Sequence, residues 1–213
     1  MKTIAEQRYS KLGPVVVQAL KSRSFDAWYF DKQEDALEKI ISLIPKDHQV
    51  SWGGSSTLNE IGIKERLENE GYALLDRDKA ATPEERGEIQ RQSLLCGTFL
   101  TSTNAVSEDG QLVNIDGYGN RVAAMIFGPK QVIVIAGMNK VVKTYEDAYS
   151  RARNIAAPMN VQRFPDCKTP CQQTGTCADC KSADTICSFF VTHRFCKPAG
   201  RIKVILIGKN LGF

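Results

Sequence analysis

The chain has 213 residues, of which 42% are hydrophobic and 24% are charged, so it is long and apolar enough to bury a sizeable core. Its formal net charge is only +4 and the basic residues are spread along the chain, which argues against nucleic acid or a membrane surface as a partner. Charged residues interrupt the N-terminus, and no segment approaches about 18 apolar residues, so we expect a cytoplasmic protein without a signal peptide or membrane span.

The first third of the chain predicts alternating helices and strands. A leading helix is expected within residues 1–25, with a break or kink at Gly13–Pro14. Repeated βαβ units predict an α/β fold, a mainly parallel sheet flanked by helices, with ligands at the carboxyl ends of the strands. The expected helices lie within residues 4–22, 36–44 and 57–71, and the expected strands are 27–30, 49–52 and 72–76.

A glycine-serine turn in the stretch QVSWGGSSTLNEIG, residues 49–62, joins a short strand to a helix. Gly53 and Gly54 allow backbone angles that side chains forbid, and Ser55, Ser56 and Thr57 offer hydroxyls and unpaired N–H groups that attract an anion. A structural interpretation stays open, since Thr57 and Glu60 also form a capping-box pattern. The Walker lysine and the full dinucleotide glycine pattern are absent, so nothing local indicates ATP or NAD.

The middle of the chain predicts one more helix followed by β-hairpins. The sequence Thr82-Pro83-Glu84-Glu85 is typical of a helix start, and Ile89, Leu94 and Leu95 would face the core. Acidic and glycine-rich turns then separate short apolar runs. The expected strands are 101–106, 111–115 and 121–127, then a buried strand over 132–136, a helix from Thr144 with Asp147 in its capping box, and a final strand over 201–207.

Polar side chains recur at the strand ends and turns of NAVSEDGQLVNIDGYGN, residues 104–120, and at Arg121. Arginine can hold a carboxylate or phosphate with two parallel hydrogen bonds, while asparagine can fix hydroxyl groups. Turn formation alone also explains Asp, Asn and Gly here. Asp116 and Glu60 are the acids that we consider as general bases. The predicted ligand-binding residues in this segment are Asn104, Asn114, Gly117, Asn120 and Arg121.

Six of the seven cysteines form a cluster from Cys167 to Cys196, inside an insertion of about residues 165–197 before the final strand. In a reducing compartment such clusters more often bind metal or do redox chemistry than form disulfides. Their spacing matches neither ferredoxin pattern, so zinc and an iron–sulfur cluster both stay open, as do free thiols. His193 is an alternative ligand, and Cys96 is expected to be buried. The predicted metal ligands are Cys171, Cys177, Cys180 and Cys187.

Three stretches in this order, SWGGSSTLNEIG, SEDGQLVNIDGYGNR and GRIKVILIGKNLGF with the cysteine run before it, resemble the LUD-domain family of lactate-utilisation proteins. The resemblance covers nearly the whole chain. It implies a single domain over residues 1–213 with a fold similar to the NagB/RpiA/CoA-transferase-like superfamily, whose members place a glycine-serine turn and an acidic loop around a small anionic substrate. It places Gly53, Gly54, Ser55 and Thr57 on that turn and Asn114, Asp116, Gly117, Asn120 and Arg121 on that loop.

Three functions are therefore open. The favoured one is a LUD-type protein that binds a small anionic metabolite and serves lactate or related 2-hydroxy-acid utilisation alongside iron–sulfur redox partners. The second is a self-sufficient isomerase or acyl-transfer enzyme, although fold analogy says little about a reaction and no glutamate is placed as a CoA-transferase nucleophile. The third is a metal or iron–sulfur redox module.

Overall fold

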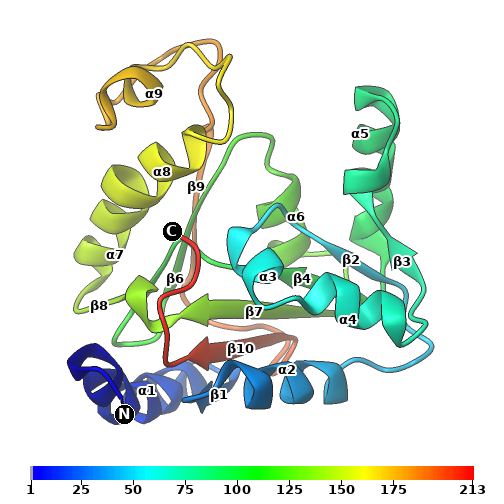
Figure 1. Ribbon diagram of the computed structural model, residues 1–213, viewed down its shortest axis with the longest axis vertical. Coiled ribbons are helices and arrows are strands. Elements are labelled where there is room, and N and C mark those ends of the chain that lie inside the picture. The colour runs from blue at the N-terminus through cyan, green and yellow to red at the C-terminus, as the bar shows by residue number, and fades with distance from the viewer. Residues whose placement is uncertain (1) are drawn as a thin grey trace.

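The computed structural model describes residues 2–213, and its two sheets are arranged as an α/β fold (Figure 1). The strands are β1 Asp26–Phe30, β2 Val50–Trp52, β3 Leu74–Leu75, β4 Thr98–Thr101, β5 Ala105–Ser107, β6 Leu112–Asp116, β7 Gln131–Gly137, β8 Val141–Val142, β9 Phe189–His193 and β10 Ile202–Ile207. The α-helices are α1 Ile4–Ser22, α2 Gln33–Ser42, α3 Ser56–Glu60, α4 Ile63–Asn69, α5 Pro83–Gln92, α6 Asn120–Ile126, α7 Tyr145–Arg151, α8 Ala157–Val161 and α9 Pro170–Thr174.

The main sheet has six strands in the order β1-β10-β7-β4-β2-β3, and all of its neighbours pair in parallel. Its centre is the continuous apolar run of β7, which is buried along its whole length and lies between β10 and β4. A strand buried on both faces needs helices on both faces. The predicted mainly parallel sheet flanked by helices is confirmed.

Alternate residues of the central strands feed two hydrophobic cores, one on each face of the main sheet. Val132 and Val134 join the core formed with α1 and α6, whereas Ile133 and Ile135 join the core formed with α2, α3 and α4. Because both faces are covered, the edge where the strands end is left to form a site.

A second sheet, in the order β8-β5-β6-β9, lies beyond the carboxyl ends of the main strands (Figure 1). β5 and β6 form the predicted hairpin, and β9 adds to β6 in antiparallel register. The insertion of about residues 165–197 therefore contributes a strand to this sheet. On one face of the sheet, α7 packs through Ala148, and its first turn has the capping box that was predicted at Thr144 and Asp147.

Four element predictions were wrong. α1 runs unbroken through Pro14, and Gly62, with φ 69°, divides the helix expected over 57–71 into α3 and α4. Residues 121–127, expected as a strand, form α6, because Gly119 begins a helix there in the left-handed conformation and Arg121 turns inward. Of the residues expected to face the core from the helix after Thr82, Leu94 packs partly buried against it, but α5 with Ile89 has no fully buried residue and Leu95 is 87% exposed. Among the described residues, no helix has the length and apolarity to cross a membrane.

Candidate anion-binding site

The candidate site lies where β2, β4 and β7 end side by side, as expected for ligands of a parallel sheet. β2 leads into the glycine-serine turn, β4 into Ser102 and Thr103, and β7 into a short 3₁₀ turn that ends with Lys140. From the second sheet, β6 brings Asn114 and Asp116 to the same edge. The structure thus joins the two segments that the sequence singled out separately.

Gly53 and Gly54 are needed for space and not for unusual backbone angles. Neither has a positive φ, contrary to the reason expected from the sequence. A Cβ on Gly53 would lie 2.9 Å from Cδ of Arg121, and one on Gly54 would lie 2.7 Å from Nη2 of Arg77. The two glycines therefore let two arginine side chains lie against the turn.

Ser55, not Thr57, caps the helix that follows the turn. Its hydroxyl accepts from the N–H of Leu58 at 3.3 Å, which rules out the capping box expected for Thr57 and Glu60. The Thr57 hydroxyl is buried and accepts instead from Nζ of Lys140 at 3.1 Å. This hydroxyl belongs to the site, while Ser56 lies half-buried at the first position of α3.

Arg121 holds the two sheets together at the site. Its side chain is 12% exposed, and Nε pairs with Oδ2 of Asp116 at 3.2 Å. Nη1 donates to Oδ1 of Asn114 at 2.6 Å and Nη2 to Oδ1 of Asn104 at 3.1 Å. Nη1 also donates to the carbonyl of Ser102, after β4. Three of the polar residues predicted around the acidic loop therefore bind this guanidinium.

Lys140 is the functional candidate that the sequence analysis missed. It is 3% exposed, and Nζ bonds the hydroxyls of Thr57 and Ser102 at 3.1 and 3.0 Å. Burial, then the charges of Arg151 and Arg121, lower the pKa of Lys140 to about 7, against a smaller opposing effect of the Glu60 carboxylate. Its place directly after the most apolar strand of the chain was the available signal.

Two further arginines add positive charge. Arg151 is 7% exposed, and its guanidinium donates to the carbonyls of Asn139 and Asn104. Nε of Arg77 is buried without a hydrogen-bond partner in residues 2–213; the nearest carboxylate oxygen, in Asp78, is 3.6 Å away. Burial lowers the pKa of both arginines, so each is a cation held partly out of water.

The two predicted general bases are already engaged. Oδ1 of Asp116 accepts from the N–H of Gly119 at 2.9 Å while Oδ2 pairs with Arg121. Glu60 is exposed and accepts from the N–H of Gly212 at 2.9 Å. Their catalytic roles stay predictions.

Gly117 and Asn120 frame the loop between β6 and α6. A Cβ on Gly117 would contact the backbone of Ile186, which ties this loop to the cysteine segment, and Asn120 opens α6. Gly117 thus has a packing role, and ligand binding by both residues stays a prediction.

Replacing each of the two turn glycines with alanine, one at a time, distinguishes their roles. Gly53→Ala is expected to lower the free energy of unfolding by about 1–3 kcal/mol, because the stem of Arg121, fixed by its hydrogen bonds, cannot give way. Gly54→Ala meets only the far end of Arg77 and should leave stability nearly unchanged. Urea unfolding of both variants measures the difference. Equal losses would contradict the fixed position of Arg121.

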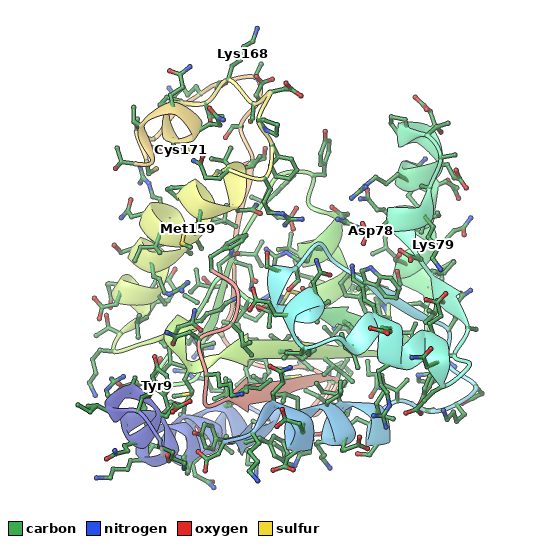
Figure 2. The ribbon with its side chains drawn as sticks, viewed as in Figure 1. Tyr9, Asp78, Lys79, Met159, Lys168 and Cys171 are labelled. Carbon is green, nitrogen blue, oxygen red and sulfur yellow. The ribbon has the colours of Figure 1, made fainter. Side chains whose placement is uncertain are left out.

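The four predicted metal ligands lie away from this edge, around a small cavity beside α8 and α9. Figure 2 shows Cys171 on α9 and Met159 on α8, on the other side of the molecule from Asp78 and Lys79. As the side chains stand, no group of three or more His, Cys, Asp or Glu residues within 2–213 is placed to hold a metal ion. Burial, then the neighbouring thiols, raise the pKa of Cys187 to about 11.

The remaining candidates near the cysteines have other surroundings. His193, the alternative ligand, does not line this cavity; both its ring nitrogens are buried without a partner in the described chain. Burial, then the charges of Arg121 and Arg201, lower its pKa to about 4. Cys96 is buried, as predicted.

A parallel-sheet α/β protein with cationic side chains gathered at the carboxyl edge of the sheet is the class that these observations define. The sequence matches the LUD domain over residues 14–207, so the chain belongs to the LUD-domain family, whose members are related to lactate utilisation. This match confirms the resemblance drawn from the three sequence stretches. A comparison with curated proteins gives no match.

The first of three solved structures that align with the chain supports the fold. A DUF162 family protein from Deinococcus radiodurans aligns with a TM-score of 0.55 at 10% identity, over 93% of this chain and 97% of that chain. Ribose 5-phosphate isomerase A from Neisseria gonorrhoeae aligns with a TM-score of 0.34 at 16% identity, over 53% of this chain and 54% of that chain. The eIF2B delta structure from Chaetomium thermophilum aligns with a TM-score of 0.36 at 15% identity, over 56% of this chain and 54% of that chain.

Proposed function

We propose that the carboxyl edge of the main sheet binds a small anionic metabolite, and that the protein serves lactate or related 2-hydroxy-acid utilisation alongside iron–sulfur partner proteins. The supporting observation is an excess of buried positive charge. Lys140 and Arg151 are buried and bond only neutral oxygens, whereas Asp116, the one buried carboxylate in residues 2–213, is paired with Arg121. Buried charge without a counter-ion is costly, and a bound anion removes that cost.

The groups around Lys140 suit a hydroxy acid. A carboxylate can be held by the cations, while hydroxyl groups of Thr57 and Ser102 match a second oxygen on the neighbouring carbon. Membership of a family related to lactate utilisation favours the same class of ligand. Since both oxygens of Asp116 are engaged, the contacts support binding more directly than they support turnover by that carboxylate.

Entry to the site requires movement of the chain that follows β10. Thr57 donates to the carbonyl of Leu211 at 3.4 Å, and a Cβ on Gly212 would lie 3.3 Å from Nζ of Lys140. Asn139 holds the same stretch through the N–H of Leu211 and the carbonyl of Gly212. An anion reaches Lys140 when these few contacts open, and the stretch can then close over it.

Titration calorimetry with lactate, pyruvate and inorganic phosphate tests the proposal. We expect saturable one-to-one binding of a carboxylate that weakens as the pH rises above about 7, because Lys140 then has to take up a proton when the anion binds. The proton uptake is measured by repeating the titration in buffers with different ionisation enthalpies. Lactamide, which has no charge, should not bind. Absence of saturable binding by all three anions at pH 6 would overturn the proposal.

A further inference from the structure

The segment between α8 and β9, residues 162–188, has few apolar residues to hold it in place. Its regular structure is the short helix α9, and the three hydrophobic cores take from it only the half-buried Cys187. Chain segments that bury little apolar surface are usually held by a disulfide or a metal ion. The cysteines of this segment are all free thiols.

Four of these thiols surround one cavity of about 50 Å³, which holds more than a single water. Cys171 comes from α9, Cys177 and Cys180 from the loop after it, and Cys187 from just before β9. The other two cysteines of the cluster do not line this cavity. Sγ of Cys167 donates to the carbonyl of Asp184 at 3.1 Å, and Sγ of Cys196 to that of Pro198 at 3.2 Å.

The backbone between Cys177 and Cys180 has the shape of a chelating turn. Asp179 has φ 51°, one of two non-glycine residues with positive φ in the described chain. A strained residue of this kind points to a functional constraint, and here it turns the chain so that two thiols two residues apart face one cavity. Arg153 from the helix beside them pairs with Asp179 at 2.9 Å, which holds the turn against the body of the protein.

We propose that Cys171, Cys177, Cys180 and Cys187 bind a single zinc ion that fixes this segment. Four thiolates in a tetrahedron are a common structural zinc site, and a pair with two intervening residues is its usual chelating half. A Zn–S bond is about 2.3 Å long, so the sulfurs that line the cavity have to move toward its centre when the ion binds. The four thiols release their protons when the ion binds.

The cysteines lie away from the anion site, but β9 and the residues before it connect them to the acidic loop of that site. Cys187 lies two residues before Phe189, which pairs with Asp116 in the register of β6 and β9. Ile186 lies against Gly117, in the loop that follows Asp116. Zinc therefore fixes the strand that supports the acidic loop.

Metal analysis of the full chain, purified without added chelator, tests the inference. We expect one zinc per chain, and cobalt substituted for it should give the visible bands of a tetrahedral thiolate site. Thiol titration of the native protein should find four cysteines protected with metal and reactive after chelation. Iron with acid-labile sulfide would overturn the single-ion site, as would four reactive thiols in protein supplied with zinc.

Two variants assign the ligands. The double variant Cys177→Ser, Cys180→Ser should lose the stoichiometric zinc, whereas Cys167→Ser, a matched change in the same segment, should keep it because that thiol does not line the cavity and bonds the carbonyl of Asp184. Loss of zinc from Cys167→Ser with retention in the double variant would overturn the assignment. The cobalt bands and thiol protection of the unmodified chain decide the matter if the double variant does not fold.

Discussion

Replacing Arg121 with alanine is expected to lower the free energy of unfolding by about 3–5 kcal/mol, the usual cost of breaking a buried ion pair on one side. The change leaves Asp116, which is 9% exposed, without its cation. It also removes the donors that hold Asn104 and Asn114 to the end of β4. Urea unfolding followed by circular dichroism gives the value.

Arg201→Ala is a matched control. Arg201 also donates to several backbone carbonyls, those of Ala124 and Met125 among them, but it has no carboxylate partner in the described chain. Its loss should therefore cost less, since no buried charge is left alone. Adding Asp116→Asn to Arg121→Ala should restore part of the stability. A double variant as unstable as the sum of the two single changes would contradict the buried ion pair.

The parts of the fold that could be predicted are those with a local cause. The run Val132–Ala136 is so apolar that it predicts a central strand, and it forms β7. Thr144 and Asp147 form the capping box of α7 within four residues of the chain. Residues 121–127 could not be assigned in this way. Their continuous apolar run after Arg121 is also compatible with a strand. The helix depends on Gly119, which begins it, and on the ion pair of Arg121 with Asp116.

Only the glycine-serine turn and the Asn- and Asp-rich segment of the candidate site could be predicted from the sequence. A glycine-serine turn after a strand can be recognised from the sequence, and so can a cluster of Asn and Asp. Lys140 gives a weaker signal, its place after the most apolar strand, because a lysine after a strand is normally solvated. Its burial arises from the chain after β10, far away in the sequence, where Gly212 closes over it. Arg77 likewise joins the site only because Gly54 leaves room for it.

Lys140→Met should raise the stability of the protein and weaken anion binding together. The pKa of Lys140 is about 7 in the folded protein against 10.5 for a lysine in water, so at pH below 7 the buried charge costs at most about 5 kcal/mol, and methionine removes that cost. The cost fades as the pH rises from 7 to 10.5, because the unfolded chain then holds the proton that the folded one lacks. Unfolding at pH 6 and pH 9 measures this: the gain from the substitution should be larger at pH 6.

Because stability is expected to rise while anion binding weakens, this variant distinguishes a ligand-binding role of Lys140 from a structural one. A variant that binds the anion roughly 10–100-fold more weakly, the worth of one charge-assisted hydrogen bond, cannot owe that loss to unfolding if it is also more stable. Lys143→Met, three residues further on, is the control, since that lysine is exposed and pairs with Glu108 at the surface; it should change neither property. If Lys140→Met instead destabilises the protein equally at both pH values and binds the anion normally, the lysine is a structural link between Thr57 and Ser102, and the anion belongs elsewhere.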